Sequence, residues 1–361
     1  MKNLLISAAI LLLIVSNSSY PQEDKKINKS AFEIAGEKVQ VANSYFGEIK
    51  IPSGDDQIET FIPISVHHGI YDGPTVAMIA GIHGSEYSPI LSMQKLTDFI
   101  DPSMLSGTLI IVHIANLPAF TSRTIYFSPN DLKNLNRSFP GNINGTVTER
   151  IAHIITKEVI KQSDYVIDIH SGDGNESLRP SYAAYYAEAG EEEVIKESKR
   201  IAVAFGLETI IQFSGSYASV DDAIYTSAQA VTLGIPAMDV ESGELGIIDD
   251  HYIDPITDGA LNVMRELGMI TGDPKLPNNP IFINDRSRVY SNHDGIFYPN
   301  PLVKTGDYVS TGTRLGMITD YHGNKLEAIN APSSGILLIL FGTPPVNEGD
   351  NIVVIGKIDN K

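Results

Sequence analysis

The sequence predicts an α/β fold, a sheet with helices on both faces, followed by a small all-β domain. Two observations carry this prediction. Between about residues 60 and 270, short apolar runs bounded by Gly, Pro and Asp alternate with segments whose apolar residues recur at helical spacing. Beyond residue 284, short β-forming runs separated by Gly-Asp turns replace that alternation. Alternation of the first kind is typical of a sheet covered by helices on both faces.

The N-terminus has the pattern of a secretory signal peptide. One lysine precedes an apolar run from Leu4 to Val15, and small polar residues follow. A membrane anchor, the alternative, needs about 20 apolar residues to span the hydrocarbon. We therefore expect residues 1–19 to be removed near Ser19 or Tyr20, and the chain to be exported to a periplasm or the outside without a stable membrane anchor. Residues 20–42 are polar and are expected to form an N-terminal tail.

Composition narrows the classes of partner. The 361 residues carry a net charge of -18, and no basic stripe is present to attract phosphate, so nucleic acid is excluded as an expected partner. The chain has no cysteine, which removes thiol chemistry and disulfides. The sequence does not fix the oligomeric state.

The elements of the first domain, residues 43–272, follow in order along the chain. Strands are predicted at 61–68, 75–81, 108–113, 165–170, 209–213 and 236–240. Helices are predicted at 88–100, 188–205, 220–233 and 256–267, and a further helix from Thr146 to about Lys161 opens with the capping-box pair Thr146 and Glu149. In such a sheet, the ligand site is built from strand ends and the loops that follow them.

The second domain is predicted at residues 285–361, after a linker at 273–284 that is rich in Gly, Pro and Asn. Its glycine-separated runs resemble a biotinyl or lipoyl-type barrel sandwich. Lys325 lacks the surrounding hairpin motif of a carrier lysine, so we expect the domain to cover the active site or to pack subunits together.

The chain lacks the G-x-S-x-G, phosphate-loop, G-x-G-x-x-G and H-E-x-x-H motifs. It does contain "AGIHGSEYSP", in which His83 and Glu86 stand three residues apart between a predicted strand and a predicted helix. Chance supplies H-x-x-E about once in two chains of this kind, and a solvated turn is the alternative reading. In a first helical turn, however, the two side chains lie side by side and could bind one zinc ion.

Two further segments end predicted central strands. His170 ends "YVIDIH" and is a candidate third zinc ligand, with Asp168 a candidate partner for its ring; a hydrogen-bonded histidine is the alternative. Glu241 ends the strand in "MDVESGELG" and is a candidate general base, with Asp239 and Glu244 as competitors.

The irregular segment "TSRTIYFSPNDLKNLNRSFPGN" supplies positive charge and a polar pair. Arg123 could stabilise a developing oxyanion, and Asn136 with Arg137 could bind a carboxylate. The alternative for each arginine is a solvated loop position.

Four motifs in order, "GIHGSE", "NLNRSFPGN", "DIHSG" and "VESG", resemble the succinylglutamate desuccinylase/aspartoacylase family, relatives of the zinc carboxypeptidases. The resemblance implies a three-layer α/β/α mixed sheet. It also implies that His83, Glu86 and His170 hold one zinc ion. Glu241 would be the general base and then the proton donor to the leaving amine. The acidic residue usual two places before the N-R pair is Asn134 here.

In the same resemblance, Asn136 and Arg137 bind the substrate carboxylate, and Arg123 polarises the scissile carbonyl. The expected activity is therefore zinc-dependent hydrolysis of the amide bond of an N-acyl amino acid or similar carboxylate-bearing small molecule. Two alternatives remain: a metallocarboxypeptidase acting on peptides, including cell-wall peptides, and a binding protein without catalysis. The acyl group and the amino acid are not readable from the sequence.

Overall fold

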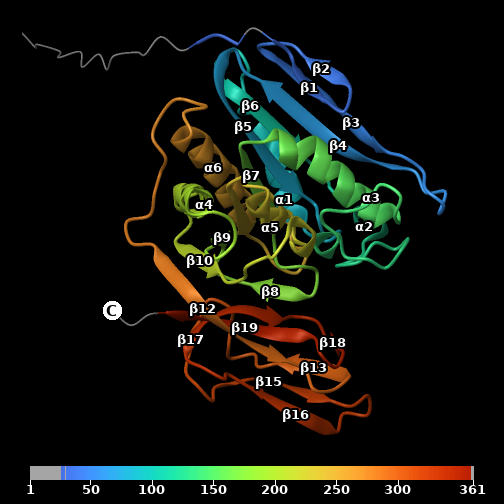
Figure 1. Cartoon of the computed structure of the whole chain (residues 1–361). Helices are drawn as coiled ribbons and strands as arrows, with labels where there is room; N and C mark the ends of the chain where they lie inside the picture. The colour runs from blue at the N-terminus through green and yellow to red at the C-terminus, as the bar shows by residue number, and fades with distance from the viewer. Residues whose placement is uncertain (1–25, 29, 359–361) are drawn as a thin grey trace, which may run out of the picture.

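A single large sheet organises the molecule. The computed structural model describes residues 26–28 and 30–358, and Figure 1 shows its strands running from the N-terminal part into the C-terminal part. The sheet has 13 strands. In spatial order they are β14 (Tyr308–Val309), β17 (Gly335–Phe341), β19 (Asn351–Ile358), β12 (Ile281–Tyr290), β10 (Thr209–Phe213), β9 (Tyr182–Tyr186), β11 (Ala237–Glu241), β7 (Tyr165–His170), β5 (Tyr71–Ala80), β6 (Ser106–Val112), β4 (Thr60–His68) and β3 (Asn43–Ile51), while β8 (Glu176–Leu178) pairs with β17.

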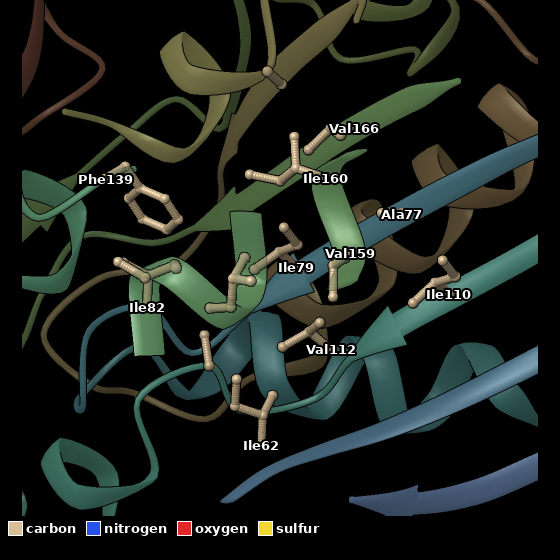
Figure 2. Close-up of a cluster of buried hydrophobic side chains, with 14 of the residues drawn as sticks. Ile62, Ala77, Ile79, Ile82, Ile110, Val112, Phe139, Val159, Ile160 and Val166 are labelled. Atoms are coloured by element: carbon tan, nitrogen blue, oxygen red, sulfur yellow. The ribbon is translucent and has the colours of Figure 1, made fainter. Parts of the chain in front are cut away.

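Helices cover both faces of the central strands, as the sequence predicts. One face packs against α1 (Tyr87–Thr97), α4 (Glu192–Ala204) and α6 (Asp250–Glu266). The other packs against α3 (Val147–Ile154) and α5 (Thr226–Thr232). Figure 2 shows the second core, where Ala77 and Ile79 of β5 meet Val159 and Ile160. The sheet is mixed, because β5, β6 and β7 run parallel while β11 pairs antiparallel with β9.

Several predicted elements match closely and others do not. Strands β7 and β10 have the predicted bounds, and the Thr146–Glu149 capping box opens α3. That helix ends at Ile154 and continues as a π-helical turn, η2 (Ile155–Val159), and a 3₁₀ turn, η3 (Ile160–Gln162). Helix α6 starts six residues earlier than predicted, because the Asp249 side chain caps it. The sequence analysis did not predict β3, β8, β9, α2 (Leu117–Ser122) or η1 (Leu135–Arg137), and η4 (Val220–Asp222) precedes α5.

The segment predicted as an N-terminal tail contains a hairpin. Strands β1 (Phe32–Ile34) and β2 (Glu37–Val39) pair antiparallel, and Ile34 and Val39 are buried in the core. The expected signal peptide lies outside the described residues. Among the described helices, none combines the length and the apolar character that a membrane span requires.

The C-terminal part is all-β, as predicted, but it is not separated from the main sheet. Its second sheet has the order β16 (Lys325–Asn330), β15 (Arg314–Thr319), β13 (Gly295–Pro299) and β18 (Pro345–Val346). Strand β12 pairs parallel with β10 through Ile283 and antiparallel with β19 from there to Tyr290. One strand thus crosses the boundary predicted at residue 285, and it carries the main sheet into the C-terminal part (Figure 1).

Candidate active site

The predicted residues gather where three neighbouring strands end. Strands β5, β7 and β11 are parallel neighbours, so their carboxyl ends meet at one edge of the sheet. His83 and Glu86 follow β5, His170 ends β7 and Glu241 ends β11. All four side chains line one cavity of about 620 Å³.

His83, Glu86 and His170 form a compact, buried triad. One ligand atom from each lies within 4.8 Å of the other two. The distance from His83 Nδ1 to Glu86 Oε1 is 2.8 Å, and that from His170 Nδ1 to Glu86 Oε2 is 3.1 Å. Glycines permit this turn, since Gly81 has φ +69° and a Cβ on Gly84 would stand 2.5 Å from the backbone of Ala119.

The buried charges of the triad shift one another's pKa values. Burial opposes ionisation of Glu86, but His170 and His83 outweigh it and lower its pKa to about 2. Burial likewise opposes protonation of His83, and the carboxylates of Asp173 and Glu86 outweigh it and raise the pKa of that imidazole. Two imidazoles and one carboxylate are a ligand set of catalytic zinc sites. The residues therefore fit a zinc ion.

Polar groups behind the triad orient both imidazole rings. Asn134 Oδ1 lies 3.2 Å from His83 Nε2, and it also accepts a hydrogen bond from the Asn136 backbone. His170 Nε2 lies 2.9 Å from Asp168 Oδ2. In both rings Nδ1 faces Glu86 and Nε2 faces the supporting group, which is the usual division between a metal-binding nitrogen and a supported one.

Glu241 stands beside His170, because the two residues pair in register across β11 and β7. Its Oε2 atom is buried without a hydrogen-bond partner among the described residues. Burial raises the pKa of this carboxyl well above its usual range, although His170 opposes the shift. A carboxyl with that environment is suited to take up a proton and release it again.

The two competitors for the role of base differ from Glu241. Glu244 accepts hydrogen bonds from Arg179, Ser177 and Tyr252 and lines a different cavity. Asp239 lines the same cavity as Glu241, but it pairs in register with Asp168, two residues before His170, and it accepts a hydrogen bond from Ser227.

Asn136 and Arg137 lie on η1 at the cavity wall, but their side chains make different contacts. The amide oxygen of Asn136 accepts hydrogen bonds from the backbone and hydroxyl of Thr226, at 2.9 and 3.2 Å. The guanidinium of Arg137 packs over the ring of Tyr225, 4.3 Å from its centroid. Within the described part of the chain no carboxylate pairs with Arg137, so it can bind one from a ligand.

Arg123 is not among the residues that line this cavity. It follows α2 with a left-handed backbone (φ 59°), and its exposed side chain lines a separate, largely apolar cavity with Tyr87, Phe120 and Ile248. The sequence analysis did not predict α2, which ends at Ser122, directly before this residue. Tyr126, three residues later, does reach the active-site cavity.

The sequence analysis missed two parts of the wall. One is aromatic and is formed by Tyr186, Phe213, Tyr217 and Tyr225. The other comes from the C-terminal part, where Arg286, Arg288 and Tyr290 of β12 line the cavity with Asn351 of β19. The alternation in "DRSRVY" could have predicted one strand face bearing these side chains, but assigning the segment to a separate domain hid its relation to the site.

Further acidic residues line the cavity on the side of His83 that faces Glu86. Asp173 Oδ2 lies 3.2 Å from His83 Nδ1, and the hydroxyl of Tyr126 donates to Glu176 at 2.8 Å. Burial raises the pKa of Asp173 to about 6 and that of Glu176 to about 7. This side is therefore rich in carboxyl groups and the wall carries the arginines.

Comparison with known proteins places this arrangement in a family. The model of the succinylglutamate desuccinylase/aspartoacylase catalytic domain matches residues 72–267, more than half of the chain. The N-alpha-acetyl-L-2,4-diaminobutyric acid deacetylase of Halomonas elongata is 30% identical over 326 residues, which cover 86% of this chain and 91% of that protein.

Solved structures agree in fold. The succinylglutamate desuccinylase/aspartoacylase of Rhodobacter sphaeroides superposes with a TM-score of 0.78 at 24% identity, over 91% of this chain and 99% of that one. The product-bound ectoine utilization protein EutE (DoeB) of Ruegeria pomeroyi gives a TM-score of 0.78 at 25% identity, over 88% of this chain and 97% of that one. The likeness thus extends through both the catalytic and the C-terminal parts.

Proposed function

The chain belongs to the succinylglutamate desuccinylase/aspartoacylase family, and from this premise we propose that it is a zinc-dependent hydrolase that cleaves the amide bond of an N-acyl amino acid. One observation carries the proposal: the buried His83, Glu86 and His170 triad shares one cavity with Glu241, whose Oε2 atom has no hydrogen-bond partner among the described residues. The deacetylase activity of the Halomonas relative supports the reaction class.

Each residue has a distinct task in this proposal. His83, Glu86 and His170 would hold zinc, which when bound polarises the scissile carbonyl and lowers the pKa of water. Glu241 accepts the proton of the attacking water as the new C–O bond forms. It then delivers that proton to the leaving nitrogen as the C–N bond breaks, which gives a carboxylic acid and an amine.

Binding is assigned to Arg137, whose planar guanidinium can hold the substrate carboxylate through two parallel hydrogen bonds. Asn136 supports the site by bonding Thr226 and facing His170, with Nδ2 3.3 Å from His170 Nε2. Arg123 has no part in this mechanism, because it lines another cavity.

Zinc quantification and a substrate panel test the proposal. We expect about one zinc per chain and hydrolysis of N-acyl amino acids, lost on chelation and restored by zinc. Cleavage of short peptides alone would replace the deacylase with a carboxypeptidase. A protein that binds no metal and turns over nothing would instead be a binding protein.

We also propose that the chain is exported, which rests on the pattern of residues 1–19. Fractionation of cells that express the full chain, followed by N-terminal sequencing of the mature protein, tests this. Recovery of intact Met1 in the cytoplasm would contradict it.

A further inference from the structure

A second cavity lies between α1, α2 and the loop that follows β11. Its volume of about 620 Å³ falls within the range of about 300 to 1,000 Å³ that is common for sites of small organic ligands. The described residues that line it are all different from those that line the active-site cavity. The proposed amide hydrolysis therefore leaves this cavity without a task.

The inner surface of the second cavity is apolar. Helix α1 contributes Tyr87, Ile90 and Leu91, which share one face because residues three and four apart on a helix are neighbours. The ring of Phe120 from α2 packs edge-on against Tyr87, with 6.0 Å between the ring centroids. Ile90 is buried, and the other three side chains are half-buried. The apolar surface is thus recessed below the protein surface.

A single charge stands at the rim of this cavity. Arg123, Gln94 and Thr121 line it with exposed side chains, and Arg123 is the one charged residue among the described residues that line it. Within residues 26–28 and 30–358, no carboxylate forms an ion pair with Arg123. The net charge of the chain is -18, so this lack of a partner does not reflect a shortage of carboxylates.

The end of α2 fixes the backbone that carries this charge. Arg123 follows the helix with a left-handed backbone at φ 59°, a conformation in which glycine is the usual residue. Its backbone N–H donates to the carbonyls of Ala119 and Phe120. The helix end itself therefore gives no reason for an arginine, and the guanidinium stands on an anchored backbone.

We propose that the second cavity binds an amphiphilic carboxylate such as a medium-chain fatty acid. The apolar body lies against Tyr87, Leu91 and Phe120, where it is removed from water. The carboxylate binds the guanidinium of Arg123 through two parallel hydrogen bonds. This binding goes beyond the proposed amide hydrolysis, because the ligand and an active-site substrate occupy separate cavities and can be bound together.

The shape of the cavity favours a small molecule over a protein or membrane partner. Such partners usually bind broad, exposed apolar patches. Among the described lining residues, Ile248 is the one strongly exposed apolar side chain, at 65%. The remaining apolar surface is recessed and is closed from several sides by three separate segments of the chain.

Calorimetric titration with octanoate tests the site and needs no turnover. Octanamide keeps the chain and removes the charge, whereas acetate keeps the charge and removes the chain. We expect one octanoate per chain, bound at least about 10-fold more tightly than either comparison compound. Equal affinities for the three compounds would overturn the proposal.

Two substitutions separate the contributions of charge and apolar surface. Arg123→Gln should weaken octanoate binding by about 10-fold to 100-fold and leave octanamide within about threefold of the parent. Leu91→Gln should weaken both compounds by about threefold to 30-fold. The matched controls Arg314→Gln and Leu302→Gln, at exposed positions of the C-terminal part, should change neither. Octanoate affinity that survives Arg123→Gln would overturn the proposal.

A further variant separates this site from the proposed function. Octanoate could also reach Arg137 in the active-site cavity. Arg137→Gln should impair hydrolysis of N-acyl amino acids and leave octanoate binding unchanged. Octanoate binding by a chain that cleaves no amide would still support the second site. Loss of octanoate binding in Arg137→Gln but not in Arg123→Gln would place the ligand in the active site and refute the proposal.

Other occupants of the cavity are read out by the same variants. Self-association of the chain that Leu91→Gln abolishes, without octanoate binding, would assign the cavity to a second copy. Binding to vesicles of anionic phospholipid, again without octanoate binding, would assign it to a lipid surface. Either result would overturn the proposal.

Discussion

The active-site cavity has a side formed by His83, Glu86 and His170 and a side formed by Arg286 and Arg288 of β12. The sequence predicted the first side and not the second. The metal-triad side follows β5 and β7 within a few residues of each strand, and its members stand in short motifs. The arginine side comes from β12, more than 100 residues later, through pairing of β12 with β10 and β19. Residues at strand ends can be found from local sequence patterns, whereas a cavity wall formed by pairing of distant strands cannot.

The largest expected effect is the loss of zinc affinity when one residue of the triad is substituted. His83→Ala or Glu86→Ala should weaken zinc binding by on the order of 1,000-fold or more, because each removes one of three protein ligands. The thermal midpoint of the metal-free protein should stay close to that of the metal-free parent. Competition with a zinc chelator measures the affinity, and His322→Ala, on an exposed turn, is the control. Unchanged zinc affinity in either ligand variant would contradict the assignment.

The buried His67, which does not line the active-site cavity, should make the stability of the protein depend on pH. Burial lowers the pKa of His67 to about 4, below an unfolded value of 6.5. The unfolded chain therefore binds more protons between these values, and stability falls as pH drops from 6.5 to 4 by roughly 3 kcal/mol. Urea unfolding at several pH values measures this.

His67→Gln should flatten that part of the stability profile, while the exposed His293→Gln should not. An identical pH dependence of unfolding in His67→Gln and the parent would show that His67 contributes no such term.

Substitution of Asn134, which contacts His83 behind the triad, should have a smaller effect on zinc binding. Asn134→Ala removes the oxygen that faces His83 Nε2 and should weaken zinc binding by about 10-fold to 100-fold. Asn134→Asp, which keeps an acceptor at the same place, should retain most of the affinity. If the alanine variant binds zinc as tightly as the parent, Asn134 does not orient the ring.

The smallest expected effect is on stability, through hydrogen bonds that connect the main part of the molecule to the C-terminal part. Glu244 accepts from Arg179 and Ser177, and Ser177 in turn bonds Thr305 of the C-terminal part. Glu244→Gln should lower the free energy of unfolding by about 1 to 2 kcal/mol, because it weakens the charge-assisted hydrogen bonds of Glu244. The effect stays small because part of this network is exposed. Denaturant titration compares it with the exposed Glu348→Gln, which should be neutral. Equal losses in both variants would argue against the network.

Most of the sheet and the triad followed from the sequence because their signals are local. Periodicity located β7 and β10, and the ordered motifs predicted that the candidate zinc ligands and Glu241 lie together. The short α2 carried no clear periodicity, so the sequence did not show that Arg123 follows a helix and lines a separate cavity. Strand β9, "YAAYY", has no polar alternation because both its faces are buried.

Predicting that Arg286 and Arg288 line the cavity would have required the register of β12 with β10 and β19, which no local sequence pattern gives. The same holds for Asn134, whose contact with His83 spans 51 residues. The sequence showed only that an amide stands where relatives carry an acid, and the structure shows which ring it faces.

The central claim is that Glu241 moves the proton in a zinc-dependent amide hydrolysis. It is tested most directly by the single-turnover rate of N-acyl amino acid cleavage by Glu241→Gln at full zinc content. The expected result is a rate lower by about 100-fold to 10,000-fold with unchanged zinc stoichiometry, because the glutamine amide cannot accept the proton. A Glu241→Gln protein that holds zinc and cleaves the substrate at the parent rate would contradict the account.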